Sequence, residues 1–151
     1  MNGRSLIALS VTIFAAGCQP PAPEGFARFV PAPEIARQAL STALEGWREG
    51  KAAGLIETVS PHVYLIDKRL RDGRKLDSFE ILGEFPADNA RGFAARLKFA
   101  GEGPDEPALA RYLVLGIDPL WIYRQEDLEM FLHWMHAMDE PKGDEISKGS
   151  P

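Results

Sequence analysis

Residues 92–100 read GFAARLKFA, and the alternation of side-chain types in this stretch decides the fold class. Successive side chains of a β-strand point to opposite faces of a sheet. Every second position here is apolar, and the positions between hold Ala or a basic side chain; the apolar set is Phe93, Ala95, Leu97 and Phe99. This period of two indicates an antiparallel strand with one face buried and the other toward water.

Strand signals also lie on both sides of this stretch. Residues 110–117 (ARYLVLGI) are apolar on both faces, which indicates a central strand. Asp72–Gly73 and Asp118–Pro119 supply turns that would separate neighbouring strands. The other strand segments are rich in β-forming side chains, and they are residues 62–70 (HVYLIDKRL), 78–85 (SFEILGEF) and 120–124 (LWIYR). We therefore expect four to five antiparallel strands.

Helical patterns flank the strands. Residues 34–49 (EIARQALSTALEGWRE) place apolar side chains three and four positions apart, between a proline and a glycine. Trp47 ends this apolar stripe, so we expect its ring to be buried against the sheet. A short helix is expected at residues 52–59 and a terminal helix at residues 127–138. The terminal helix should turn four side chains inward, namely Leu128, Phe131, Leu132 and Met135.

Together these segments predict an α+β fold, in which an N-terminal helix packs on a curved antiparallel sheet of four to five strands, with a C-terminal helix. The arrangement, over about residues 34–125, resembles the NTF2-like and cystatin-like families. The segments ALEGWREGK and DGRKLDSFEILGE also resemble small bacterial lipoproteins that carry such a domain. We expect a single domain at residues 34–138 and a disordered tail at residues 139–151.

Residues 1–17 have the features of a secretory signal. Arg4 is the only charged side chain before Cys18, an apolar run follows it, and small residues precede the cysteine. The run is too short to span a bilayer, which takes about 20 apolar residues. A cysteine directly after the small residues resembles the signal of bacterial lipoproteins. That resemblance implies cleavage between Gly17 and Cys18, and a diacylglycerol thioether on the Cys18 sulfur.

One position departs from the lipoprotein pattern, because Ala15 stands where that family usually has leucine. Ordinary secretion with a free thiol and an uncleaved anchor therefore stay open as alternatives. Lipidation is favoured because it removes an exposed lone thiol from an oxidising compartment. Residues 18–33 would then be a lipidated cysteine and a proline-rich tether. We expect the domain to lie outside the cytoplasm, attached through Cys18 to the cell membrane or the outer membrane.

The overall charge and the cysteine count exclude some classes of protein. The chain has 17 basic and 22 acidic residues, which give a formal net charge of −5. An acidic chain without a basic cluster is a poor partner for nucleic acid, so we expect no nucleic-acid binding. A single cysteine allows no internal disulfide, and the hydrophobic core must therefore supply the stability of the domain.

The histidines do not predict a metal site. His133 and His136 lie three positions apart in the predicted terminal helix, and His62 is the only other histidine. A zinc site needs at least three protein ligands, and no motif supplies a third one near this pair. We therefore predict no bound metal and no cofactor.

Acid–base chemistry would have to use carboxylates and tyrosines, and the candidates are Tyr64, Asp67, Asp77, Glu80, Asp118 and Tyr123. We expect Glu80 to face solvent and Asp118 to be a turn residue. An unbroken strand would place Tyr64 and Asp67 on opposite faces of the sheet. The sequence therefore predicts no catalytic residues.

Aromatic side chains in the predicted elements could form plain core or line a ligand pocket. The candidate pocket residues are Trp47, Tyr64, Phe79, Phe93, Tyr112 and Trp121. Our first hypothesis is a membrane-anchored lipoprotein of the cell envelope whose domain is non-enzymatic and binds an envelope protein or a cell-wall component. The alternative is an NTF2-like enzyme or small-ligand carrier that uses the concave face of the sheet.

The lipoprotein hypothesis predicts the effect of Cys18→Ser. The acylated cysteine would be the only strong anchor of the mature chain, so the variant should move from the membrane fraction to the soluble fraction. Cell fractionation followed by immunoblotting measures the change. A processed Cys18→Ser protein that still fractionates with membranes would contradict the lipid anchor.

Overall fold

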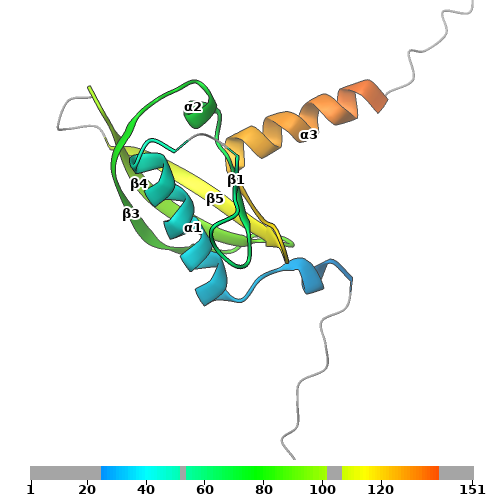
Figure 1. The fold of residues 1–151 in the computed structure, drawn as a ribbon. Helices are drawn as coiled ribbons and strands as arrows, with labels where there is room; N and C mark the ends of the chain where they lie inside the picture. Colours follow the sequence, from blue (N-terminus) through cyan, green and yellow to red (C-terminus); the bar gives the residue numbers. More distant parts are fainter. Residues whose placement is uncertain (1–24, 52–53, 102–106, 140–151) are drawn as a thin grey trace, which may run out of the picture.

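The computed structural model describes residues 25–51, 54–101 and 107–139 of the chain (Figure 1). The predicted signal at residues 1–17, Cys18, and residues 140–151 of the predicted tail lie outside the described residues. In chain order the elements are η1 (Gly25–Phe29), α1 (Pro33–Arg48), β1 (Leu55–Ile56), β2 (Val63–Ile66), α2 (Lys68–Arg71), β3 (Leu76–Phe85), β4 (Arg91–Phe99), β5 (Ala108–Gly116), β6 (Leu120–Arg124) and α3 (Gln125–Asp139).

The described strands form one six-stranded sheet in the order β1-β2-β6-β5-β4-β3. Neighbouring strands are antiparallel except for β2 and β6, which run parallel. The α+β class and the helix packed on a sheet are confirmed. The purely antiparallel, curved sheet of four to five strands is wrong in detail, because the sheet is mixed, has six strands and is not strongly curled. At the β3 edge, a register shift between Ile81 and Gly83 marks a bulge.

Two predicted elements near the start of the sheet are corrected. The predicted strand at residues 62–70 ends at Ile66, because Asp67 caps the short helix α2 by accepting a hydrogen bond from the Arg69 backbone N–H at 2.8 Å. The predicted helix at residues 52–59 is replaced, in its described part, by β1 and turns. Pairing of β1 with β2 overrides the weak helical preference of that segment.

The core lies between α1 and one face of the sheet. The side chains of this core come from α1 and from β2 to β6, and they include Leu40, Leu44, Leu76, Phe93, Leu97, Phe99, Tyr112, Val114, Leu120 and Ile122. Trp47 is 3% exposed, its ring centroid lies 5.5 Å from that of Phe99, and its Nε1 donates a hydrogen bond to the Arg74 carbonyl oxygen at 2.7 Å. The predicted burial of Trp47 against the sheet is confirmed.

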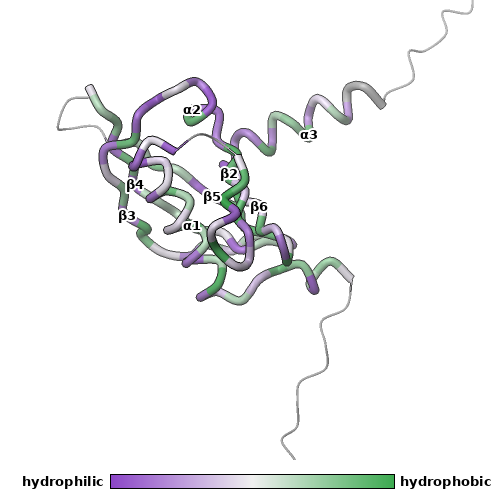
Figure 2. Tube along the Cα trace, viewed as in Figure 1, coloured by the Kyte–Doolittle hydropathy of each residue, from purple (hydrophilic) through white to green (hydrophobic). Residues whose placement is uncertain are grey.

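The opposite face of the sheet is apolar over β2, β6 and the end of β5, although α1 does not cover it. Strand register places six half-buried side chains on this open face, namely Tyr64, Ile66, Leu113, Leu115, Trp121 and Tyr123. Figure 2 shows the hydrophobic positions of β2, and it shows hydrophobic and polar positions mixed along α3. The sheet therefore has one closed face and one open face.

Helix α3 begins directly after β6 and runs away from the rest of the domain (Figure 1). The prediction that its apolar side chains point inward is wrong for three of four residues: Leu128 is half-buried, but Phe131, Leu132 and Met135 are 59%, 44% and 42% exposed. No loop between β6 and α3 turns the helix back over the sheet, which explains its direction. Among the described helices, none has the length and apolar character needed to cross a membrane.

Trp47→Ala should lower the free energy of unfolding by about 3–5 kcal/mol, the usual cost of deleting a large buried aromatic side chain. Phe26 provides a matched control, because it is 73% exposed on η1 and its replacement by Ala should change stability by about 0.5 kcal/mol or less. Denaturant unfolding followed by circular dichroism measures both. Equal losses of unfolding free energy in the two variants would contradict the burial of Trp47 in the core.

Candidate functional site

A groove of about 380 Å³ lies between α3 and the neighbouring end of the sheet. Ile66 and Tyr123, at the end of the open face, belong to its lining, and Lys68 and Arg71 of α2 add basic groups. The α3 side is formed by Asp127, Met130, Phe131 and Trp134. The groove is therefore largely apolar, with positive charge contributed by α2.

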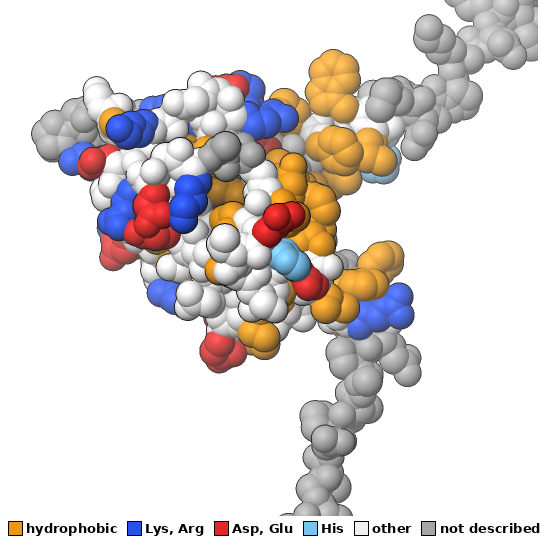
Figure 3. Space-filling model, in the orientation of Figure 1, with side chains coloured by type: hydrophobic (Ala, Val, Ile, Leu, Met, Phe, Trp, Pro, Cys, Tyr) orange, Lys and Arg blue, Asp and Glu red, His pale blue; other side chains and the backbone are white. Residues whose placement is uncertain are grey.

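The exposed surface of α3 continues the groove outward. Its exposed large apolar side chains are Met130 (46%), Phe131 (59%), Leu132 (44%), Trp134 (65%) and Met135 (42%). Figure 3 shows hydrophobic side chains on α3 and on the adjoining side of the body. We call α3 and the groove beside it the α3 surface. Contiguous exposed apolar area of this kind marks an interaction site more often than a solvated face.

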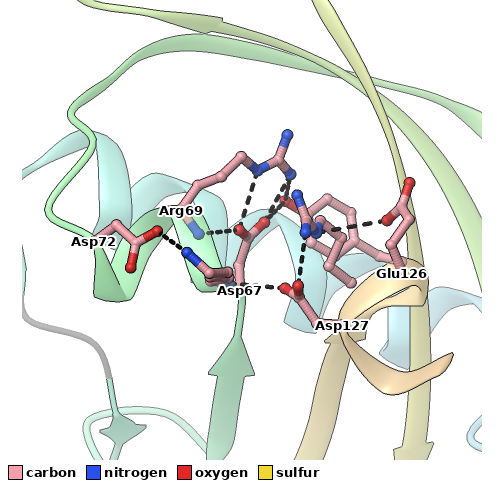
Figure 4. A network of polar contacts seen from close by, with 8 residues as sticks. Asp67, Arg69, Asp72, Glu126 and Asp127 are labelled. Atoms are coloured by element: carbon pink, nitrogen blue, oxygen red, sulfur yellow. Dashed lines mark hydrogen bonds and ion pairs between the residues drawn. The ribbon is translucent and has the colours of Figure 1, made fainter. Parts of the chain in front are cut away.

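A buried polar cluster lies close to the base of α3 (Figure 4). Asp67 is 1% exposed, and its Oδ2 accepts hydrogen bonds from the Tyr112 hydroxyl at 2.8 Å and from an Arg69 guanidinium nitrogen at 2.7 Å. The Arg69 Nε and backbone N–H both donate to Oδ1, at 3.1 and 2.8 Å. The carboxylate is therefore satisfied on both oxygens, and α2 is tied to β5.

The first turn of α3 joins the same region. Asp127 accepts a hydrogen bond from the Lys68 backbone N–H at 2.7 Å and one from the Arg124 guanidinium at 2.6 Å. Glu126 adds a looser ion pair to Arg124 at 3.5 Å. These contacts connect α2, the end of β6 and α3 (Figure 4), so they hold α3 in its outward direction.

The environment keeps the buried cluster in one protonation state. Burial alone would raise the pKa of Asp67, but hydrogen bonds from Arg69 and Tyr112 and the positive charge of Arg69 hold that pKa below its ordinary value. Burial, and then the Asp67 charge, raise the pKa of the Tyr112 hydroxyl well above its ordinary value. At neutral pH, Asp67 is thus an ionised acceptor and Tyr112 a neutral donor. This arrangement stabilises structure and does not suit proton transfer near pH 7.

His62 and Asp118 form a second polar pair, which the sequence did not predict. The His62 Nδ1 lies 2.7 Å from Asp118 Oδ1, and the His62 backbone N–H donates to the same oxygen at 2.9 Å. These backbone and side-chain hydrogen bonds lower the pKa of Asp118. Asp118 occupies the turn between β5 and β6, as expected. Both side chains are nearly half exposed, so the pair lies on the surface and not in a closed site.

The remaining acid–base candidates are dispersed. Tyr64 lies on the open face and Asp67 in the core, on opposite sides of the sheet as expected. Glu80 is exposed, as expected, and pairs with Arg96 at 2.6 Å, while Asp77 is exposed on β3. Burial, and then the nearby Tyr64, raise the pKa of Tyr123.

The aromatic candidates for a pocket fall into two groups. Trp47, Phe93 and Tyr112 are buried in the core, with Phe79 half-buried against them. Tyr64 and Trp121 lie on the open face, where their ring centroids are 4.8 Å apart, and Tyr123 continues the row at 6.3 Å from Trp121. The structure therefore does not bring the six residues together around one space.

A larger groove of about 570 Å³ runs beside α1 and mixes polar and apolar side chains, including Glu34, Gln38, Thr42, Val63 and Leu120. Neither His62 nor Asp118 lines it. Within residues 25–51, 54–101 and 107–139, no group of three or more His, Cys, Asp or Glu side chains has the arrangement of a metal site.

Asp67→Asn should lower the free energy of unfolding by about 3 kcal/mol at pH 7, because it removes one partner of a buried ion pair. The pKa of Asp67 is lower in the folded chain than in the unfolded chain. Its ionisation therefore contributes stability above about pH 4, and that contribution is lost as pH falls below this value. The difference in free energy of unfolding between the wild type and Asp67→Asn should therefore become smaller below pH 4.

Urea unfolding of both proteins between pH 7 and pH 2 measures this difference in free energy of unfolding. Tyr112→Phe, which keeps both charges, should cost about 1.5–3 kcal/mol, because it removes the hydrogen bond that the hydroxyl donates to the Asp67 carboxylate and the longer one, at 3.4 Å, that it accepts from Arg69. If the difference between wild type and Asp67→Asn stayed constant down to pH 2, the charge of the carboxylate would not contribute to the stability of the domain.

Comparison with known proteins does not assign a family to this chain. No protein-family model matches the sequence, and no curated protein matches it at a significant level. The resemblance to NTF2-like and cystatin-like domains is supported only as far as an α+β domain with a six-stranded mixed sheet flanked by helices. The α3 surface and the polar groups around it are therefore the features of the described residues that bear on function.

Proposed function

We propose that this chain is a lipid-anchored protein of the cell envelope, and that its domain is a non-enzymatic binding module whose contact surface is the α3 surface. The observation that carries the proposal is the exposure of Met130, Phe131 and Trp134 beside an apolar groove. Leaving such side chains in water is unfavourable, by about 25 cal/mol for each Å² of apolar area. A partner that covers them recovers this free energy.

The dense packing of the closed face of the sheet, which is the face that α1 covers, supports a binding module over an enzyme. An enzyme or carrier that used this face would need converging polar groups around an open cavity. The face under α1 instead carries Phe93, Phe99 and Leu97 in close contact, and its polar groups, Asp67 and Tyr112, are buried and bonded to each other. The membership in an NTF2-like or cystatin-like lipoprotein family is part of this proposal.

The charge of α3 favours a protein partner over a lipid surface. Helices that lie on anionic membranes carry Lys and Arg beside their apolar side chains. Among its residues, Gln125–Asp139, α3 carries four carboxylates and two histidines and has no Lys or Arg. Attachment to the membrane is therefore assigned to Cys18, and the α3 surface is left for an envelope protein.

Photo-crosslinking tests the binding module directly. The photoreactive analogue p-benzoylphenylalanine replaces Trp134 in one version of the full chain and Arg48, exposed on α1, in a control version. In cells that produce the protein, the version with the probe at position 134 should give protein adducts of discrete mass, at a yield at least about tenfold above the control. Equal yields, or no adduct at position 134, would contradict the proposal.

A further inference from the structure

We propose that η1 contacts the lipid surface of the membrane in which Cys18 is anchored, and that this contact directs the α3 surface away from that membrane. The inference rests on the proposed lipid anchor, and it goes beyond the anchor by naming a second contact of the domain with lipid. Two observations carry it: Phe26 is exposed on η1, and η1 lies close to Cys18 along the chain.

η1 presents an aromatic side chain that the core of the domain does not use. Phe26 is 73% exposed, more than any other large apolar side chain among the described residues, and Phe29 is half-buried. The chain is fixed to the sheet two residues after η1, where Arg91 Nε donates a hydrogen bond to the Pro31 carbonyl oxygen at 3.2 Å. The exposed ring of Phe26 therefore has a defined place on the domain.

The length of chain between Cys18 and η1 keeps η1 near the lipid. Seven residues, 18–24, precede Gly25, and a chain of this length spans at most about 25 Å. A second contact made by a molecule that is already attached is intramolecular, with an effective concentration in the millimolar range for a short linker. The weak membrane affinity of one exposed aromatic side chain is therefore enough to hold η1 at the lipid surface.

The charge around η1 suits a lipid surface, in contrast to the charge of α3. Between Gly25 and Pro33 the only charged side chain is Arg28, so no carboxylate of this segment has to leave water. Arg28 is exposed, and its guanidinium lies 4.6 Å from the centre of the Phe29 ring. An arginine so placed can reach lipid phosphates while its apolar stem stays beside the aromatic rings.

The position of η1 decides which end of the domain faces the membrane. The first turn of α1, which follows η1 after three residues, shares a groove with Leu120 at the start of β6. α3 follows Arg124 at the end of β6, so η1 and α3 lie at opposite ends of this strand (Figure 1). Figure 3 shows hydrophobic and basic side chains at the place of η1. With η1 at the lipid, the α3 surface faces a partner on the side away from the membrane.

Photo-crosslinking to lipid tests the contact. The mature chain, residues 18–151, is coupled through its single cysteine to phosphatidylcholine vesicles that contain a maleimide-bearing phospholipid, so attachment does not depend on enzymatic lipidation. p-Benzoylphenylalanine replaces Phe26 in one version and Leu109 in the control, because Leu109 is 64% exposed at the end of β5 remote from Arg91. Mass spectrometry should find phospholipid adducts at position 26 at a yield at least about tenfold above position 109.

These vesicles carry no net charge, which separates the two sources of affinity. Glu24 and Glu34 flank the segment and offset Arg28, so we expect the contact to depend on the aromatic ring and to need no anionic lipid.

A second measurement tests the orientation. With the probe at position 134, lipid adducts should be as rare as at position 109. Phe26→Ser should raise the yield at position 134 at least about threefold, because the domain is then no longer held at the lipid by η1. Leu109→Ser, which removes an apolar side chain of similar exposure, should leave that yield unchanged. Circular dichroism of each variant shows that its fold is kept.

The outcomes separate the η1 contact from the lipid anchor. Equal lipid adducts at positions 26 and 109 overturn the contact, while the anchor stands if Cys18→Ser moves to the soluble fraction in cells. Lipid adducts as frequent at position 134 as at position 26, or a yield at position 134 that Phe26→Ser leaves unchanged, overturn the orientation. If Cys18→Ser stays with the membranes in cells, the anchor is wrong, and this inference is wrong with it.

Discussion

The carboxylate of Asp67 is the constraint on which the arrangement of this domain depends. It follows β2 directly and caps α2, so it decides where the strand ends and where the chain turns. Its bonds to Tyr112 and Arg69 join α2 to the middle of the sheet. A buried carboxylate without these partners would cost several kcal/mol, so the local geometry is strongly specified. The hydrogen bond from the Lys68 backbone N–H to Asp127 then fixes the first turn of α3 relative to α2.

The consequence for α3 is an exposed helix in a defined direction. A helix joined to the domain by the backbone alone could take many orientations, and binding a partner through it would carry the free-energy cost of ordering it. Here Arg124 and Asp127 hold the first turn against α2 and β6 before any partner is present. The apolar side chains of α3 are therefore presented in a fixed position, which is the arrangement expected of a binding surface.

The fold was predictable from the sequence wherever one local period dominates. The alternation in residues 92–100 is enough to predict β4, and the apolar stripe that ends at Trp47 is enough to predict α1 and its burial. The parallel pairing of β2 with β6 joins segments far apart in the chain, and no local signal marks it. The polar cluster has no local signal for the same reason: the pattern around Asp67 predicts a strand, and the pattern around Tyr112 predicts core or pocket lining. For α3 the pattern predicts a helix correctly. Met130 and Trp134, however, make the apolar part of its surface wider than one face of the helix. This width indicates that the helix does not bury all of its apolar side chains against the sheet.

The two edges of the sheet affect how the molecule can associate. In the described part of the chain, β3 is one edge strand, and it carries a bulge after Ile81 and the exposed carboxylates of Asp77, Glu80 and Glu84. The other edge is β1, which is only two residues long. Bulges, edge charges and very short edge strands all hinder the addition of a strand from another molecule. The sheet is thus protected against uncontrolled edge-to-edge aggregation, even though the chain keeps an apolar helix exposed on its surface.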